Sequence, residues 1–333
     1  PYAVPYDDDG NRIEFPGGDD RVKNPVGEWD YQTDTRKTLR VLGAMYAQLN
    51  FGDIWSPLKG LSYRFNFGPD FSMTDRGLFV DAKSFNRAGA NYALNNKSHK
   101  FSWTLDNMIT YNREFGKHSV GVTLLQTASA YDYRTMNMDA ENLPIPSALW
   151  NNMGSVSALR SYGTSLIQQQ LESYMARVNY TFGGRYMITA SVRSDGASQL
   201  AEGHKWATFP SVALGWRIDK EEFMQNISWI EQLKLRAGYG VTGNAAIDPY
   251  KTKGAIAGLY YPFGNSATQG YIGYDPMLKD GKIRNLPMAN KELTWEKTTQ
   301  YNIGIDFGFL NGRISGVFDI YKSHTDGLLM QQS

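Results

Sequence analysis

The stretch NYTFGGRYMITASV, residues 179–192, carries the pattern that decides the fold. Apolar and polar side chains alternate on both sides of the Gly-Gly pair at 183–184, so that Tyr180 and Ile188 fall on the same face. Strict alternation is the period of a β-strand, and two glycines between two such runs are typical of a β-hairpin. The stretch therefore predicts two antiparallel strands joined by a tight turn, with one apolar face and one polar face.

The same period recurs along the chain and predicts about ten strands. A second hairpin turns on Asn311-Gly312, which is the strongest short hairpin signal. A third hairpin turns at EFGK, residues 114–117. The expected strands cover residues 39–52, 60–73, 100–112, 118–130, 169–182, 186–196, 207–218, 233–242, 297–308 and 313–325.

Strand length and loop length together favour a membrane barrel over a soluble sandwich. Strands of about 10–14 residues exceed the ~5–6 that are usual in soluble sheets and reach the ~9–11 that a tilted membrane strand needs. Short links alternate with long ones at 74–99, 131–168 and 243–296, and the link at 219–232 is typical of a short amphipathic helix capped by Asp219. Aromatic residues recur near strand ends, as in an interfacial belt. We expect an all-β fold, an antiparallel up-and-down transmembrane β-barrel with short periplasmic turns and long extracellular loops.

Composition excludes several classes of protein. The 34 basic and 33 acidic residues leave a net charge of +1, which gives no electrostatic case for a nucleic-acid partner. Without cysteine the chain has no disulfides or thiolate metal sites. No apolar run is long enough for a membrane helix, which excludes helical spans only. Residues 1–25 lack the charged and apolar regions of a signal peptide, and we expect the chain to be a fragment of something longer.

Gly238, Gly240 and Gly243 spell G-x-G-x-x-G, the written form of a dinucleotide-binding fingerprint. That fingerprint works only where the glycine turn opens a helix, whereas Pro249 and further glycines follow here. The surrounding residues 233–244 instead alternate as a strand does, which excludes a dinucleotide-binding enzyme on context.

Three stretches closely resemble the C-terminal barrel of SusC/RagA-type TonB-dependent outer-membrane transporters. They are FPSVALGWRIDKEEFM (209–224), LKLRAGYGVTGN (233–244) and LTWEKTTQYNIGIDFGFLNGRISGVFDIYKSHTDGLL (293–329). ASVRSDGAS (190–198) and YNREFGKHSVGVTLLQ (111–126) are also similar to that family. The resemblance implies the outer membrane of a Gram-negative, Bacteroidetes-like bacterium, with lipid around the barrel. It also implies import of oligosaccharides or peptides, a SusD-like surface lipoprotein as a lid, and energy from the TonB complex.

The departures from the family pattern define the expected domains. The family's plug domain and TonB box have no counterpart in the sequence, and the ten expected strands fall short of the about 22 strands of such transporters. We therefore expect residues 1–38 to be an extracellular loop segment and residues 39–333 to be a partial barrel. Contact with the TonB complex is expected through the missing N-terminal region.

Two other function classes stay open at the level of sequence. The first is a non-transporting surface β-barrel or adhesin that binds host or glycan ligands through its long loops. A plug domain upstream in the parent gene would separate it from a transporter. The second is a soluble glycan hydrolase, for which no acidic pair is found, and neither G-x-S-x-G nor H-E-x-x-H surrounds any histidine. We expect no enzyme.

Aromatic residues in or beside the expected loops are the candidate cargo contacts, because sugar rings or peptide side chains could stack on them. The alternative is that they pack the loops together or against a lid. The candidates are Trp150, Trp206, Tyr250, Tyr260, Tyr261 and Trp295.

Charged residues on the polar strand faces are the second candidate set. They are Arg177, Arg193, Asp195 and Arg236. They could contact a ligand, and we favour the alternative that they form salt bridges in the lumen wall and hold a plug.

No metal site and no cofactor are predicted. DDDGN at 7–11 invites a calcium interpretation, but the position of the bidentate glutamate of an EF-hand is occupied by Gly18. A solvated Asp-Gly turn is the favoured interpretation, with an irregular calcium loop as the alternative.

Overall fold

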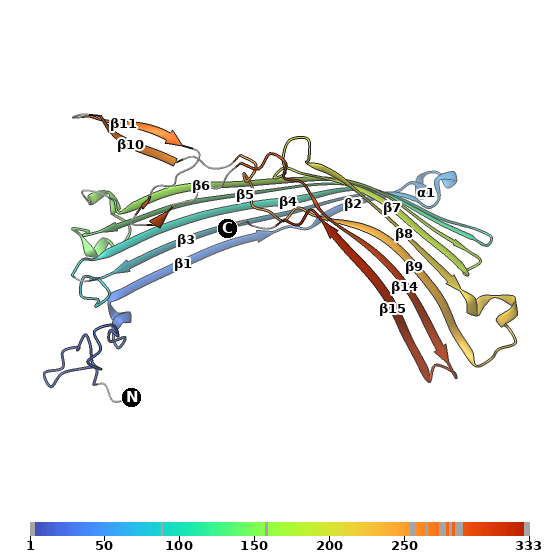
Figure 1. The fold of residues 1–333 in the computed structure, drawn as a ribbon, viewed down its shortest axis with the longest axis horizontal. Helices are drawn as coiled ribbons and strands as arrows, with labels where there is room; N and C mark the ends of the chain where they lie inside the picture. Colours follow the sequence, from blue (N-terminus) through green and yellow to red (C-terminus); the bar gives the residue numbers. More distant parts are fainter. Residues whose placement is uncertain are drawn as a thin grey trace. The chain divides into compact units, whose positions relative to one another are not determined.

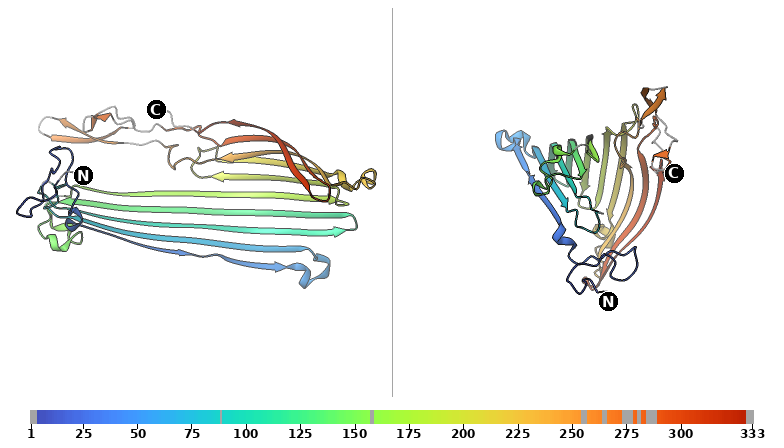
Figure 2. Two further views of the ribbon diagram at one scale, coloured as in Figure 1. Left: turned by 90° about the horizontal axis from the view of Figure 1, so that it is seen from below. Right: turned by 90° about the vertical axis from the view of Figure 1, so that its left-hand side faces the viewer.

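The structure is a computed structural model that describes residues 4–87, 89–156, 159–253, 257–263, 266–272, 278–279, 282–283 and 289–329. Its main element is a sheet of 11 strands in the order β1-β3-β4-β5-β6-β7-β8-β9-β14-β15, with β2 also paired to β3 (Figure 1). Sequence neighbours thus lie beside each other from the first strand to the last, as Figure 2 shows in two further views. The all-β, antiparallel, up-and-down prediction is confirmed.

The strands of this sheet are β1 Gln32–Leu42, β2 Met45–Asn50, β3 Leu61–Val80, β4 Tyr92–Phe115, β5 His118–Glu141, β6 Ser161–Phe182, β7 Tyr186–Ala197, β8 Trp206–Arg217, β9 Ile230–Asn244, β14 Glu296–Phe309 and β15 Ile314–Asp326. Two small hairpins lie between β9 and β14, namely β10 Ala257–Phe263 with β11 Ser266–Ile272, and β12 Leu278–Lys279 with β13 Lys282–Ile283. The helical elements are short: α1 Phe51–Ile54 and the 3-10 turns Glu28–Tyr31, Ser56–Leu58, Pro146–Ala148, Met153–Ser155, Ile218–Lys220 and Glu222–Met224. No helix in the described ranges is long and apolar enough to cross a membrane.

The predicted hairpin at 179–192 is confirmed, because Phe182 pairs with Tyr186. Gly183 and Gly184 both take positive φ, at 58° and 64°, which only glycine adopts at little cost, and the N–H of Arg185 donates to the carbonyl of Phe182 at 2.9 Å to close the turn.

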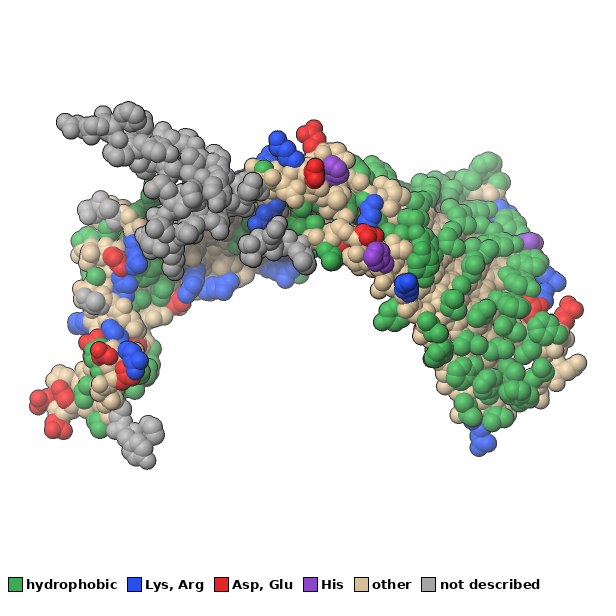
Figure 3. All heavy atoms as spheres, viewed as in Figure 1, with side chains coloured by type: hydrophobic (Ala, Val, Ile, Leu, Met, Phe, Trp, Pro, Cys, Tyr) green, Lys and Arg blue, Asp and Glu red, His purple; other side chains and the backbone are tan. Residues whose placement is uncertain are grey.

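The two faces of the sheet differ in chemistry, and we name them the apolar face and the polar face. The apolar face carries Ile188, Leu214 and Ile303, whose side chains are 45, 49 and 62% exposed. In a soluble sandwich such residues would be buried. Figure 3 shows hydrophobic side chains gathered over the strands at the right of the view. An apolar face without a protein cover fits a lipid environment.

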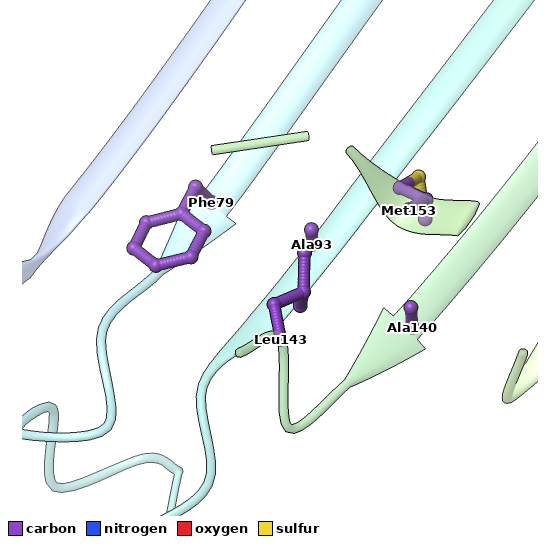
Figure 4. Close-up of a cluster of buried hydrophobic side chains, with 5 residues drawn as sticks. All are labelled: Phe79, Ala93, Ala140, Leu143 and Met153. Carbon is purple, nitrogen blue, oxygen red and sulfur yellow. The ribbon is translucent and has the colours of Figure 1, made fainter. Parts of the chain in front are cut away.

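The chain divides into two compact units, and the strands β3 to β6 contribute residues to both. The first comprises residues 1–43, 69–102 and 131–168, and the second comprises residues 44–68, 103–130 and 169–333. The first unit has a small core in which residues of the loop after β5 cover the ends of β3, β4 and β5 (Figure 4). This core consists of Phe79, Ala93, Ala140, Leu143 and Met153. The core of the second unit consists of Ala197, Leu200, Ala207, Phe209 and Trp295.

Four strands run well beyond their predicted limits, and one of them, β6, begins at Ser161 where the prediction began at 169. β3 continues to Val80, β4 begins at Tyr92 and β5 continues to Glu141, so much of the expected loops at 74–99 and 131–168 is strand. The alternation is lost at residues 74–77 and 95–100, which are polar on both faces, and it changes phase between Tyr133 and Met136, while the backbone ladder continues through all of them. β1 likewise begins at Gln32, within the segment 1–38 that was expected to be a loop.

The expected strand 39–52 is broken in two. β1 ends at Leu42 opposite Asp70, and β2 begins at Met45 opposite Phe67, so the register continues across the gap. Pro69 lies opposite the gap and has no N–H to give to the ladder. Its carbonyl still accepts the N–H of Gly43 at 2.9 Å.

The prediction of an amphipathic helix at 219–232 is wrong. Two 3-10 turns, Ile218–Lys220 and Glu222–Met224, stand there, and β9 already starts at Ile230. The Asp219 carboxylate accepts the N–H of Leu233 at 3.2 Å and pairs with Arg217, so it closes a turn between β8 and β9 instead of capping a helix.

Candidate functional site

Three of the predicted charged residues, Arg177, Arg193 and Asp195, lie on the polar face of β6 and β7. Arg193 Nε lies 2.7 Å from Asp195 Oδ1, and its Nη2 donates to Ser173 Oγ at 3.1 Å. Asp195 is buried and lies opposite Ser173 in the register. Arg177 is exposed on the same face, opposite Ser191. The arrangement of Arg193 and Asp195 is that of a salt-bridged wall.

Arg236 is the centre of a second network on the polar face. Its guanidinium donates to Asp306 at 2.9 Å and to Asp319 at 3.1 Å, so it joins β9 to β14 and β15. Gly304 lies opposite Arg236, and a Cβ at this glycine would be 2.7 Å from Arg236 Nη2. The glycine therefore leaves the space in which the guanidinium lies flat across three strands.

The two predicted tryptophans of the second unit have different surroundings. Trp206 is half exposed at the start of β8 and stacks on Tyr174, with ring centroids 6.0 Å apart. Both residues lie on the apolar face, where they suit an interfacial belt.

Trp295 was predicted to be an exposed aromatic residue. This part of the prediction is wrong, because only 6% of the residue is exposed. Its ring packs edge-on against Phe209 at 5.4 Å, and its Nε1 donates to the carbonyl of Lys205 at 2.8 Å. Trp295 therefore ties the base of the 245–295 segment to the turn between β7 and β8. Gly243 faces the same ring system, since a Cβ there would overlap the Phe209 ring. This packing is the role of the third glycine in the G-x-G-x-x-G stretch.

The other aromatic candidates do not share one environment. Trp150 belongs to the first unit, where it is half buried and lies over Gly77. It lines a pocket of about 560 Å³ together with Met138, Met153 and Leu159. Tyr250 is exposed and has a left-handed φ of 69°. Tyr260 and Tyr261 lie on β10 opposite Gln269 and Thr268, and their side chains lie outside the described atoms.

The first unit also has a polar pocket that the sequence analysis did not predict. It has a volume of about 370 Å³ and is lined by Arg36, Thr74, Arg76, Asn96, Lys97, Ser98, Tyr133, Thr135, Met136 and Asn137. These residues come from the parts of β1, β3, β4 and β5 that lie outside the predicted strands. The signal that could have found them is the accumulation of Arg and Lys beside tyrosine just outside the apolar stretches.

Arg76 and Asp34 form a bidentate ion pair beside this pocket, at 3.1 and 2.7 Å. Arg76 lies beyond the predicted strand 60–73, and Asp34 lies before the predicted strand 39–52. The hydrogen bonds from Arg76 hold the pKa of the Asp34 carboxyl below its ordinary value. The Asp34 carboxylate is therefore charged throughout the neutral range.

Asp7 in the DDDGN stretch uses its carboxylate locally. Its Oδ1 accepts the N–H groups of Asp9 at 3.0 Å and Asn11 at 2.7 Å, which is the geometry of an Asp turn. Within the described ranges no three His, Asp or Glu side chains come together as metal ligands. An irregular calcium loop stays a sequence-level alternative.

An antiparallel sheet with an exposed apolar face, a polar face joined by ion pairs and sequential strand order defines a section of a membrane β-barrel wall. The chain belongs to the family described as TonB dependent receptor-like, beta-barrel, whose model matches residues 1–333. Membership indicates an outer-membrane barrel, in a family of transporters and not of enzymes.

Curated relatives and solved structures agree with this family. A TonB-dependent receptor of Formosa agariphila is 30% identical over 98% of the chain. The TonB-dependent receptor SusC of Bacteroides thetaiotaomicron is 40% identical over 51% of the chain. The structure of the RagAB peptide transporter matches 97% of the chain with a TM-score of 0.78 at 21% identity, which shows a shared fold. The SusC/RagA-type resemblance is thus confirmed.

The chain spans only part of these proteins. It covers 32% of the Formosa receptor, 16% of SusC and 34% of the RagAB chain. The match therefore describes a partial barrel section.

Proposed function

We propose that this chain is part of a transporter that imports oligosaccharides or peptides across the outer membrane of a Gram-negative bacterium. A TonB complex supplies the energy, and a SusD-like surface lipoprotein covers the extracellular mouth and delivers cargo. The observation that supports this most is the two-faced sheet, with an apolar face for lipid and a polar, ion-paired face that suits a lumen. The structural neighbour RagAB is a peptide transporter, which supports import as the activity.

The segment between β9 and β14 is the proposed contact for cargo or lid. It is much longer than the ~4–6 residues of an ordinary link, and loops of such length usually have a function. We keep Tyr250, Tyr260 and Tyr261 as proposed contacts, whereas Trp295 anchors the base of the segment. Arg193, Asp195 and Arg236 are proposed as wall residues that face a plug.

Uptake by living cells tests the proposal. Deletion of the parent gene is expected to abolish accumulation of a labelled oligosaccharide or peptide mixture, and deletion of the TonB gene is expected to have the same effect. An affinity-tagged parent protein is expected to retain a surface lipoprotein during purification.

The adhesin alternative makes the opposite prediction. If gene deletion removed binding of a ligand to the cell surface while accumulation stayed at the wild-type level with or without TonB, the protein would be a surface binder and the import proposal would be wrong.

A further inference from the structure

Two arginines face each other directly on the strands β1 and β3. Arg36 and Arg76 are cross-strand partners in the register, so their side chains project from the same face. Like charges placed directly opposite each other destabilise a sheet. Asp34 bonds Arg76 with both oxygens, and among the described residues no hydrogen bond or ion pair is found for Arg36. Two arginines that face each other in this way form an arrangement that an anionic ligand would stabilise.

Positive charge predominates around this pair. Arg36 and Arg76 line the pocket of about 370 Å³, and Asp34 pairs with Arg76 beside it. Two cross-strand pairs further along the same face, Arg40 and Lys100 share the carboxylate of Asp70, at 2.9 and 3.8 Å. Among these described residues of this face, four cations thus stand against two carboxylates, and a bound carboxylate or sulfate would reduce the repulsion between Arg36 and Arg76.

An aromatic pair lies on the other side of the pocket. Tyr133 lines it, and the Tyr133 ring stacks on that of Tyr131 with centroids 6.4 Å apart and planes 29° apart. The ammonium group of Lys100 lies 5.6 Å from the centre of the Tyr131 ring. A tyrosine ring offers a flat apolar surface to the C–H face of a sugar and a polar edge to its hydroxyl groups.

The rest of the lining consists mainly of small hydrogen-bonding groups. Thr74, Ser98, Thr135 and Asn137 line the same pocket, and Thr135 bonds Ser165 at 2.6 Å. The reverse side of these strands is covered, because Phe79, Ala93 and Ala140 pack under the loop after β5. Hydroxyl and amide groups can bond the hydroxyl groups of a sugar, and the flat ring of Tyr133 favours a sugar ring beside them.

We propose that this pocket binds the acidic group of an anionic oligosaccharide. Arg36 and Arg76 hold a carboxylate or sulfate ester between them, and Tyr133, supported by Tyr131, lies against the sugar ring. This inference rests on the proposed import function and names the substrate class. The volume of about 370 Å³ is within the range of roughly 300–1,000 Å³ that is typical of small-ligand sites.

Binding to the purified full-length transporter tests the proposal by isothermal titration calorimetry. The ligands are tetragalacturonate, a sulfated chondroitin tetrasaccharide, neutral cellotetraose and tetraglutamate. The acidic sugars are expected to bind more tightly than cellotetraose, with affinity that falls as salt rises. The two acidic sugars distinguish carboxylate from sulfate as the preferred group.

Arg36→Gln is the decisive variant, and Lys37→Gln is its matched control, since the control removes the same charge from the other side of β1 opposite Asp75. Arg36→Gln is expected to weaken binding of the acidic sugars about tenfold or more, as the loss of a charge-assisted hydrogen bond requires. Lys37→Gln is expected to leave it unchanged. Because Arg36→Gln removes a like-charge pair, its melting temperature should not fall.

Tyr133→Leu should weaken the binding of the acidic sugars and of cellotetraose alike. Tyr162→Leu, at an exposed tyrosine, is its control and should leave binding unchanged. The proposal is overturned if neither acidic sugar binds, if cellotetraose binds as tightly, or if Arg36→Gln behaves as Lys37→Gln. Tetraglutamate binding with equal affinity and equal sensitivity to Arg36→Gln would also overturn it. Binding is measured on purified protein and import is measured in cells. The acidic-sugar proposal can therefore fail while the import proposal holds, and the reverse.

Discussion

Gly304 shows how one missing side chain sets the geometry of an ion-pair network. Arg236 crosses this glycine to reach Asp306 and Asp319. Gly304→Ala would force the guanidinium out of its place, and overpacking of this kind costs about 1–3 kcal/mol. We expect a lower unfolding midpoint for this variant in a denaturant titration of the full-length protein.

Gly238→Ala is the matched control on the same face, because the nearest atom to a Cβ there is 4.0 Å away. It should have little effect. Equal midpoints for the two variants would mean that the Arg236 network does not need the glycine.

Trp295 was a candidate cargo contact with loop packing as the alternative, and in the structure it is buried and packs the loop. Trp295→Ala removes a packed ring, a change that typically costs about 3–5 kcal/mol in a core. The expected result is rapid proteolysis within 245–295 while the barrel stays assembled.

Trp295→Phe retains packing against Phe209 and loses the hydrogen bond to Lys205, so its proteolysis rate should lie between those of the wild type and the alanine variant. Wild-type rates for both variants would contradict the anchoring role.

At the scale of elements, the register of β7 assigns adjacent residues to different environments. Ile188 lies on the apolar face, and Thr189 lies on the polar face with its hydroxyl bonded to Asn179 at 2.9 Å. Ile188→Arg near the midplane should cost ~2–4 kcal/mol, and Thr189→Arg should cost much less. Folding titrations in lipid measure both. A more damaging Thr189 variant would mean that the two faces of this strand are inverted.

The segment before β1 is held to residues 84–86 by a charged contact. Arg12 lies between the rings of Tyr31 and Phe85, at 4.8 and 4.2 Å, and pairs with Glu28. Burial alone would raise the pKa of the Glu28 carboxyl, but hydrogen bonds from Ser84 and the Phe85 N–H together with Arg12 bring it below its ordinary value. The carboxylate therefore stabilises the docked segment above the ordinary pKa of a glutamate.

This stabilisation should be lost as the pH falls through the lowered pKa of Glu28. Hydrogen exchange of residues 12–31, corrected for intrinsic rates, should show protection at pH 6 that disappears in strong acid. Glu28→Gln should reduce protection at pH 6. Protection that did not change with pH or with this variant would contradict the role of the charge.

Sequence reasoning predicted the strands well where one face meets lipid and the other meets water. The hairpins at 183–184 and 311–312 were found because glycine, asparagine and alternation agree locally. The extensions of β3, β4, β5 and β6 were missed, since residues 74–77 and 95–100 are polar on both faces and the alternation within 131–141 changes phase. The pocket of Arg36 and Arg76 was missed for the same reason, and Trp295 was misplaced because burial of a loop residue depends on its tertiary neighbours.

At the scale of the molecule, the sheet is a section of a larger barrel. The chain corresponds to about a third of its full-length relatives, so its edge strands β1 and β15 require neighbours in the parent protein. The full-length protein is expected to fractionate with outer membranes and to change its gel mobility on boiling. Recovery of folded protein in the soluble periplasmic fraction would exclude a barrel.

The central claim is that one face of the sheet meets lipid and the other meets water. Spin labels at single cysteines placed in turn at positions 186–193 of a cysteine-free full-length protein test it by electron paramagnetic resonance in membranes. Even positions should be accessible to oxygen, which concentrates in lipid, and odd positions should be accessible to a water-soluble nickel complex. The opposite alternation, or nickel accessibility at every position, would contradict the account.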